Sequence, residues 1–388
     1  MKSVAIVSTY APSEQFGGPA RIFHLRRLLE RYGYRVTHVI VDSAPSRGDI
    51  RKTDLHLTVR TDRATFDPMY DDLALGDKAR SSATVDAVVR HLREHHVSLI
   101  VMEQPFLSEM VRDVVAVEPI PVIYSSANIE YRLRRELERF APNRARTPES
   151  NRRIRDLEQL SVDLGAAVTA ICPTDAELLT QEYGVGSVTV VPNGSVAAEG
   201  ALAALRPRQR RYFAFAGSAY WPNTEGLADV ATPSLAFLPP DVRLEVAGSV
   251  CGPLSEHPQI NLHHGVNFGR LSLNGFLPMR ELIDLMYHSL AVLVPITIGQ
   301  GSNLKTADAL ASGAPVILTE RAVRGYEDVL DADSEGVTVV ESITEFRAAM
   351  RAAVEAPTRT SPVGVPRRQM LTWDQRLQPF LELVTSLV

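Results

Sequence analysis

The sequence predicts an α/β protein with two doubly wound domains, each built on a parallel sheet. Three observations indicate this fold class. The chain has 388 residues, which is too long for one ordinary core and fits two domains of roughly 150–200 residues. It begins with an apolar run at 2–8, a loop at 9–19, a helical pattern at 20–32 and a second apolar run at 35–41. The same order of strand, glycine loop, helix and strand recurs at 291–319, as in parallel-sheet units.

Composition excludes several function classes. The net charge of −5 argues against general nucleic-acid binding. No run of about 18 uncharged apolar residues occurs, so no membrane-spanning helix is predicted. The only cysteines, Cys172 and Cys251, are far apart, which favours a reducing compartment without disulfides. The apolar start is better explained as a strand than as a signal peptide, because a glycine loop and a helix follow it. We therefore expect a cytoplasmic protein.

In the first half, apolar runs and helical periodicity alternate. Strands are predicted at 2–8, 35–41, 99–102, 121–124, 168–172 and 188–191, and helices at 20–32, 84–95, 108–117, 131–165 and 176–183. The polar segment 43–78 is expected to have little regular structure. The tract 131–165 is rich in arginine but mixes charges, which favours a solvated helix face over a positive rim for an anionic acceptor or membrane. The stretch 195–211 has the composition of a linker.

The second half repeats this alternation. Strands are predicted at 212–216, 243–247, 260–263, 291–295, 315–318 and 337–340, and helices at 225–231, 279–287, from 304 to Gly313, at 343–354 and at 372–387. The predicted domains are therefore 1–200, 201–370 and a final helical segment 371–388.

The stretch 291–319 contains the strongest local signal for a ligand. A loop with Gly299, Gly301, Ser302 and Asn303 joins a strand to a helix. The first turn of a helix has unpaired N–H groups, and glycine lets an anion approach them. Lys305 lies in that turn and is one of four lysines, with Lys2, Lys52 and Lys78. Its compact charge suits a phosphate. The alternative is an ordinary βαβ unit with a glycine turn.

Polar clusters follow two strands of the first half, at the sheet edge where such folds bind ligands. Glu103 and Gln104 follow 99–102, and Asn128 and Glu130 follow 121–124. For Asn128 a binding role and a helix-capping role stay open, while capping is favoured for Glu130. His24, on the helix 20–32, could approach the same edge, although packing or a surface position is favoured.

The glycines of the first loop, Gly17 and Gly18, are adjacent, so the dinucleotide fingerprint G-x-G-x-x-G is absent. The segment FGGPARIFHLRRLL instead resembles the GG loop of GT-B glycosyltransferases, in particular the retaining GT4-like group (glycosyl transferases group 1). Further resemblances are GS-x-x-W-P-N at 217–223, NGFLP at 274–278, G-Q-G-S-N-L-K at 299–305, SSANIE at 125–130, VTVVPNG at 188–194 and TWDQRLQPFLELV at 372–384. They cover nearly the whole chain.

The sequence departs from this family at several positions. Gln300 and Asp308 stand where the family has a pair of glutamates, and Ala127 stands where it often has histidine. The Arg and Lys that many relatives carry after the strand at 212–216 are missing, so more of the diphosphate charge would fall to Lys305.

The resemblance implies a GT-B fold of two Rossmann-like domains facing a deep cleft, with the last helix returning to the first domain. It implies catalytic roles for Lys305, Asn128 and Gln300. The implied acceptor-binding residues are His24, Glu103, Gln104 and Asn128. The implied donor-binding residues are Gly17, Gly18, Gly217, Ser218, Asn223, Phe276, Leu277, Gly301, Ser302, Asn303, Lys305 and Asp308, the last for the ribose hydroxyls. No metal and no cofactor are expected, and the sequence has no Asp-x-Asp motif.

The expected function is transfer of a sugar, with retention, from a nucleotide-diphosphate sugar to a carbohydrate, lipid-linked or small-molecule acceptor. Catalysis would chiefly stabilise the charge that grows on the β-phosphate. We expect a bacterial cytoplasmic enzyme that binds no nucleic acid, with peripheral contact to the inner face of the plasma membrane as a further expectation. Two alternatives stay open, a nucleotide-sugar epimerase of GT-B type and a catalytically inactive GT-B binding protein.

Overall fold

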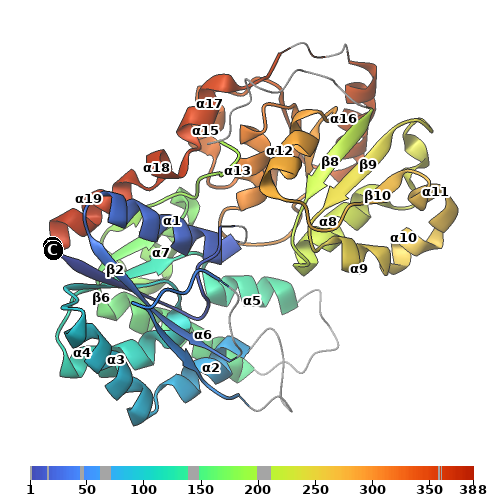
Figure 1. Ribbon diagram of the computed structural model, residues 1–388. Helices are drawn as coiled ribbons and strands as arrows, with labels where there is room; N and C mark the ends of the chain where they lie inside the picture. Colours follow the sequence, from blue (N-terminus) through green and yellow to red (C-terminus); the bar gives the residue numbers. More distant parts are fainter. Residues whose placement is uncertain are drawn as a thin grey trace. The chain divides into compact units, whose positions relative to one another are not determined.

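The computed structural model describes residues 2–14, 17–43, 48–61, 71–138, 148–198, 211–356, 359 and 361–388. It divides into two compact units (Figure 1). The first unit is Met1–Pro192 with Leu377–Val388, and the second is Asn193–Arg376. The predicted domain boundary after residue 200, with most of the predicted linker, lies outside the described residues.

The first unit is built on a parallel sheet with the strand order β3-β2-β1-β4-β5-β6-β7. Its strands are β1 (Ser3–Ser8), β2 (Arg35–Asp42), β3 (Leu55–Thr58), β4 (Leu99–Met102), β5 (Val122–Ser126), β6 (Gly165–Ala170) and β7 (Val188–Val190). β1 and β4 are buried along their whole length, which explains why they appear in the sequence as unbroken apolar runs. The strand order reverses between β1 and β4, so their carboxyl ends form the expected ligand-binding edge of this sheet.

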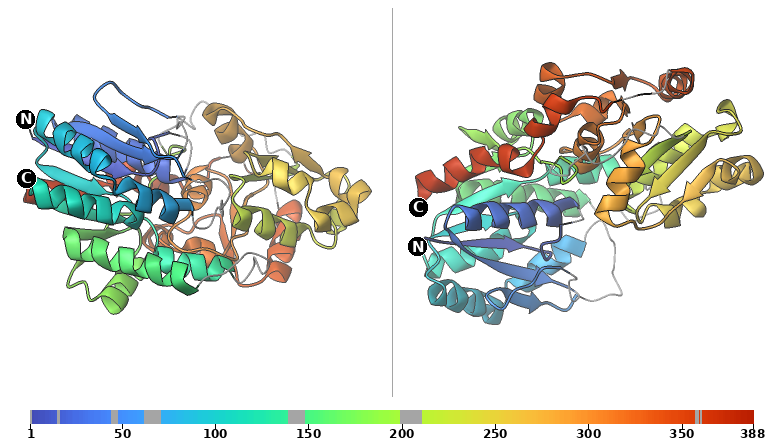
Figure 2. Two further views of the ribbon diagram at one scale, coloured as in Figure 1. Left: turned by 90° about the horizontal axis from the view of Figure 1, so that it is seen from below. Right: turned by 45° about the horizontal axis from the view of Figure 1, so that its top comes forward.

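Helices cover both faces of this sheet. They are α1 (Gly17–Arg31), α2 (Asp71–Ala79), α3 (Ser82–Glu94), the 3₁₀ turn Pro105–Leu107, α4 (Ser108–Val117), α5 (Glu130–Glu138), α6 (Pro148–Leu164), α7 (Pro173–Tyr183) and α19 (Gln378–Leu387). α19 buries Phe380, Leu381 and Val384 and lies beside α1 (Figure 1). The chain ends meet in this unit (Figure 2), where Lys2 donates a hydrogen bond to the Val388 carbonyl.

The prediction of little regular structure at 43–78 is wrong for the described part of this segment, which forms β3 and most of α2. β3 extends the sheet at its edge, in parallel to β2. The polar residues that hid this strand are used inside the unit. Asp54 makes a two-bonded ion pair with Arg26, with distances of 2.9 and 3.0 Å, and His56 lies 2.7 Å from Asp42.

The second unit is built on a parallel sheet with the strand order β10-β9-β8-β11-β12-β13. Its strands are β8 (Tyr212–Ala216), β9 (Arg243–Ala247), β10 (Leu271–Leu273), β11 (Val292–Val294), β12 (Val316–Thr319) and β13 (Val337–Val340). Alternate residues of β8 enter different cores, Phe213 and Phe215 on one face and Tyr212 and Ala214 on the other, as a sheet covered on both faces requires. Here the strand order reverses between β8 and β11.

The helices of the second unit are short. They are α8 (Trp221–Ala231), the 3₁₀ turn Leu235–Phe237, α9 (Cys251–Ser255), α10 (Pro258–Leu262), α11 (His264–Phe268), α12 (Met279–Tyr287), α13 (Leu304–Ala311), α14 (Glu320–Val323), α15 (Glu327–Ala332), α16 (Ile343–Glu355), α17 (Val365–Met370) and α18 (Trp373–Arg376). Nowhere in the described ranges is a helix both long and apolar enough to cross a membrane.

Several element predictions need correction. Residues 260–262 belong to α10, and the edge strand is β10, whose three residues are too few for a clear pattern. The helix predicted at 372–387 is divided into α18 and α19, since Pro379 cannot continue a helix that precedes it. α1 and α8 begin earlier than predicted, at Gly17 and Trp221, because a proline is tolerated in the first turn of a helix.

Candidate functional site at the carboxyl edge of the second sheet

The glycine loop, residues 295–303, leads from β11 to α13. Gly299 and Gly301 have φ angles of 129° and 70°, which glycine adopts without strain. Asn303 is the N-cap residue of α13 but makes no capping hydrogen bond with its side chain. The first-turn amides of α13 are therefore not covered by Asn303, and they carry the positive end of the helix dipole. This geometry suits an anion.

Lys305 is held at the same place. Its Nζ lies 3.4 Å from Asn303 Oδ1, and its side chain is half-buried. Burial lowers the pKa of Lys305 from 10.5 to about 7, because the charged ammonium loses water. An anion bound at the start of α13 would favour the charged form again, so this lysine is suited to bind phosphate.

The loop after β8 lies next to the glycine loop in the sheet order. Asn223 is buried, and its Nδ2 donates to the Ser218 carbonyl oxygen at 2.9 Å and to Ser218 Oγ at 3.3 Å. Asn223 therefore fixes the loop that carries Gly217 and Ser218. α8 also packs closely on the end of β11, since a Cβ at Gly226 would clash with the Pro295 carbonyl oxygen.

The loops after β8, β9 and β10 are joined by backbone hydrogen bonds. Gly217 N donates to Ala247 O at 3.0 Å, and Gly248 N donates to Gly275 O at 2.6 Å. Gly248 has a φ angle of 101°, and a Cβ there would clash with the Gly217 carbonyl oxygen. Phe276 in the third of these loops is 58% exposed, while Leu277 is half-buried. The predicted donor residues of these loops thus lie along one edge of the sheet.

Asp308, in the middle of α13, is bound by the segment that follows β7. Ser195 Oγ donates to Asp308 Oδ1 at 2.6 Å, and Asn193 Nδ2 donates to Ser302 Oγ at 3.2 Å. Burial raises the pKa of Asp308 from 3.8 to about 6, although hydrogen bonds from Ser195 and the Ala197 amide oppose this shift. The Pro-Asn-Gly-Ser segment therefore holds α13 from the side, a contact that sequence reasoning did not anticipate.

We expect Ser195→Ala to lower the free energy of unfolding by about 1–3 kcal/mol, since it leaves the half-buried Asp308 carboxylate without one of its donors. The measurement is urea unfolding at pH 7. Ser255→Ala is the matched control, because the Ser255 hydroxyl makes an exposed, local hydrogen bond to the Gly252 carbonyl oxygen, and its loss should cost less than about 0.5 kcal/mol. Equal losses in the two variants would contradict this role for Ser195.

Gln300 is held by residues that follow β12. Its Oε1 accepts a hydrogen bond from Arg324 Nη1 at 3.0 Å, and Arg321 Nη1 donates to Gly299 O at 3.3 Å. Nothing in the sequence indicated that the segment around Arg324 contacts the glycine loop.

The predicted GG loop is the first turn of α1 and not a loop. A Cβ at Gly17 would meet no atom within 4 Å, whereas a Cβ at Gly18 would clash with the Tyr10 phenol. Gly18 is therefore needed for the close approach of Tyr10 after β1. The first-turn amides of α1 lie at the carboxyl edge of the first sheet, as the anion-binding prediction requires.

Two of the predicted acceptor residues are buried. Glu103 is 1% exposed, with Arg21 Nε 3.9 Å away, and burial raises its pKa against the opposing effect of Arg21. His24 is 3% exposed and meets the Phe23 ring edge-on, which agrees with packing. Gln104 is half-buried and accepts a hydrogen bond from the Thr9 hydroxyl.

The capping role considered for Asn128 and Glu130 belongs to Glu158. The Glu158 carboxylate accepts the backbone N–H groups of Glu130 and Tyr131, at 2.7 and 3.1 Å. Burial raises the pKa of Glu158 to about 8, while the hydrogen bond from Tyr183 opposes the rise. Asn128 Nδ2 instead donates to Glu130 Oε1 at 3.2 Å. Glu158 is 28 residues away from the helix start that it caps, so no local pattern could reveal it.

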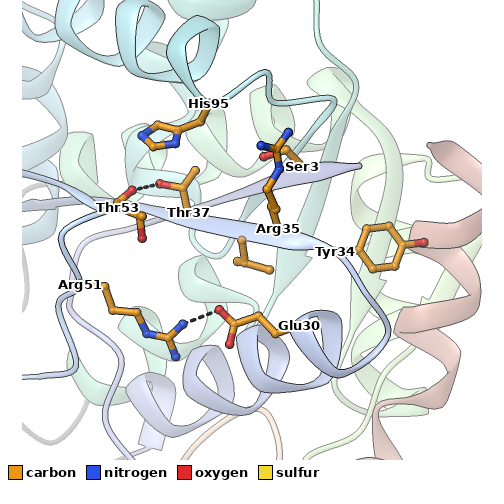
Figure 3. A pocket seen from close by; sticks show the side chains of 9 residues that line it. Ser3, Glu30, Tyr34, Arg35, Thr37, Arg51, Thr53 and His95 are labelled. Atoms are coloured by element: carbon orange, nitrogen blue, oxygen red, sulfur yellow. Dashed lines mark hydrogen bonds and ion pairs between the residues drawn. The ribbon is translucent and has the colours of Figure 1, made fainter. Parts of the chain in front are cut away.

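A pocket of about 300 Å³ lies elsewhere, at the amino ends of β1 and β2 (Figure 3). Its lining includes Arg51, which pairs with Glu30 on α1, and Thr37, whose hydroxyl donates to Thr53 O. None of the predicted site residues lines it. Across the residues that the structure describes, no group of three or more His, Cys, Asp or Glu side chains could hold a metal ion.

Residues 210–356 match the family model of glycosyl transferases group 1. The second unit carries a glycosyl transferases group 1 domain. This domain confirms the predicted enzyme class, a glycosyltransferase. A comparison with curated protein sequences finds no match.

Solved structures confirm the predicted GT-B fold of this glycosyltransferase. Sucrose-phosphate synthase from Thermosynechococcus elongatus is similar with a TM-score of 0.70 and 16% identity, over 100% of this chain and 99% of that chain. Anabaena HepE in complex with UDP and glucose is similar with a TM-score of 0.69 and 14% identity, over 100% of both chains. WaaG, a glycosyltransferase involved in lipopolysaccharide biosynthesis, is similar with a TM-score of 0.60 and 16% identity, over 98% of this chain and 95% of that chain.

Proposed function

We propose that this glycosyltransferase moves a sugar from a nucleoside diphosphate sugar to a carbohydrate, lipid-linked or small-molecule acceptor, with retention and without a metal ion. The observation that carries the proposal is the start of α13. A glycine loop, first-turn amides that their N-cap residue does not cover, and a half-buried lysine come together there.

The chemistry follows from the leaving group. When the glycosidic bond to the donor breaks, negative charge grows on the β-phosphate, and donors fixed in advance stabilise it best. The dipole of α13 and the Lys305 ammonium are such donors. In this proposal the departing phosphate helps to take the proton from the acceptor hydroxyl on the same face of the sugar, which gives retention.

The other predicted residues keep supporting roles in the proposal. We assign contacts with the reacting groups to Gln300 and Asn128, and a contact with the ribose hydroxyls to Asp308.

HepE has been solved with UDP, with UDP and glucose, and with UDP-glucose, so UDP is the first diphosphate to test here. The two cysteines, Cys172 and Cys251, are not joined in a disulfide, which favours a cytoplasmic enzyme.

The test is a thermal-shift screen of UDP, GDP, ADP, CDP and dTDP. A ligand at about 100 times its dissociation constant should stabilise the protein by roughly 2.7 kcal/mol. We expect one diphosphate to raise the melting temperature, and its nucleotide sugar to turn over when acceptors are added. Sugar interconversion without an acceptor would favour an epimerase instead. Binding without turnover would favour an inactive binding protein, and no shift with any diphosphate would contradict the donor site.

A further inference from the structure

Three residues that follow β12 or end it donate hydrogen bonds to the glycine loop. The Thr319 hydroxyl donates to Ile296 O at 2.5 Å. Arg321 Nη1 donates to Gly299 O at 3.3 Å, and Arg324 Nη1 donates to Gln300 Oε1 at 3.0 Å. We call Thr319, Arg321 and Arg324 the loop brace. All of its donors lie on 319–324 and all of their acceptors on 296–300, so the brace contacts consecutive parts of one loop.

A glycine loop needs such support. Gly299 and Gly301 have conformations that other residues rarely adopt, and glycine loses more backbone freedom on ordering than any other residue. If the loop were ordered only when the diphosphate binds, that loss of entropy would weaken binding. Hydrogen bonds within the protein that already fix the loop reduce this loss.

The brace is itself held in place. Gly325, which directly follows Arg324, donates its N–H to Glu327 Oε2 at 2.8 Å. Arg376 on α18 donates to the Gly325 carbonyl oxygen at 2.8 Å and lies 2.6 Å from Asp328 on α15. The turn that carries Arg324 is thus fixed to two helices, α15 and α18, and its position does not depend on the glycine loop alone.

We propose that the loop brace positions the glycine loop for the diphosphate, with Arg324 acting through Gln300. This inference rests on the proposed donor site. It adds three positioning residues, none of which lies in the glycine loop or in α13.

Arg324→Gln tests the inference. We expect it to weaken binding of the stabilising nucleoside diphosphate by about tenfold, the effect of losing one hydrogen bond from a charged group. Arg324→Lys should restore part of the affinity, and Arg280→Gln, at an exposed position on α12, should bind like the wild type. Isothermal titration calorimetry gives the dissociation constants.

A double-mutant cycle with Gln300→Ala shows whether Arg324 acts through Gln300. If it does, Arg324→Gln should have little further effect in the Gln300→Ala background. Full additivity, or wild-type affinity of Arg324→Gln, would overturn the inference.

Hydrogen exchange of 296–303 in the unliganded protein separates this inference from the proposed function. Arg324→Gln and Thr319→Val should speed exchange there by about tenfold while exchange in β8 and β9 stays unchanged. Unchanged exchange in the loop would overturn the brace even if the wild type binds a diphosphate. Faster exchange in a protein that binds no diphosphate would uphold the brace and reject the donor site.

Discussion

Lys305→Ala is expected to weaken binding of the donor diphosphate by about 10- to 100-fold. The ammonium is half-buried at the start of α13. If it is removed, water cannot fully take over its contact with the bound phosphate. The positive end of the helix dipole lies at the same place and attracts the same anion. Hydrogen bonds to charged groups contribute about 1.5–3 kcal/mol, and each 1.4 kcal/mol changes the affinity about tenfold. Turnover should fall further, by about 10²–10³ in kcat, because the charge on the β-phosphate is largest in the transition state.

Lys305→Met also removes the ammonium, but it keeps nearly the side-chain volume of lysine. Because the pKa of Lys305 in the folded protein is lowered to about 7, the unfolded chain binds more protons between pH 7 and 10.5. The stability of the wild type should therefore rise with pH across that window and be lowest below pH 7. Lys305→Met has no ammonium to bury, so it does not lose stability at low pH in this way. Its melting temperature at pH 6–7 should therefore equal or exceed that of the wild type. Lost binding then cannot be ascribed to unfolding.

Calorimetric titration with the diphosphate is the measurement, and Lys78→Ala is the matched control. Lys78 is exposed in the last turn of α2, in the other unit. Its replacement should leave the affinity unchanged. If Lys305→Met bound the diphosphate as tightly as the wild type, Lys305 would have no part in the donor site.

The elements that could be predicted from the sequence are those whose signal is local. The runs of β1 and β11 are apolar because both faces of their sheets are covered. The loop glycines, the helix start at Leu304 and Lys305 lie within seven consecutive residues, 299–305, so their spacing alone brings them together. A short-range pattern thus located the best candidate site and the fold class.

The features that the sequence did not reveal depend on residues that are distant in the chain. Arg324 is 24 residues from Gln300, and Ser195 is 113 residues from Asp308. Each hydrogen bond forms only because the fold brings two separate segments to one sheet edge. β3 escaped prediction for a related reason, since Asp54 and His56 are polar residues whose partners lie on α1 and β2.

Asp308 shows how such a contact changes the interpretation of a motif. Its carboxylate is one methylene shorter than the glutamate of the related motif, and it is already bound by Ser195 and the Ala197 amide. A ribose hydroxyl must therefore share this carboxylate with the segment after β7. We infer that a donor contact of Asp308 depends on Ser195, which the sequence of the glycine loop alone does not indicate.

Binding of the diphosphate is expected to take up about one proton per site at pH 8. Lys305 is mostly neutral in the free protein at this pH, because burial lowers its pKa to about 7, and a bound anion favours the ammonium. The dissociation constant should then rise about tenfold per pH unit above pH 7, until the pKa of Lys305 in the complex is reached.

Other groups change little in this window. A terminal phosphate, with a second pKa of about 6, is already ionised above pH 7, and so is Asp308, whose pKa is raised only to about 6. Titrations at pH 8 in two buffers of different ionisation enthalpy give the number of protons taken up. In Lys305→Met the uptake should vanish and the remaining weak binding should become nearly independent of pH from about 7 to 9. The same uptake in this variant would assign the proton to another group and remove the main physical reason for placing the β-phosphate at Lys305.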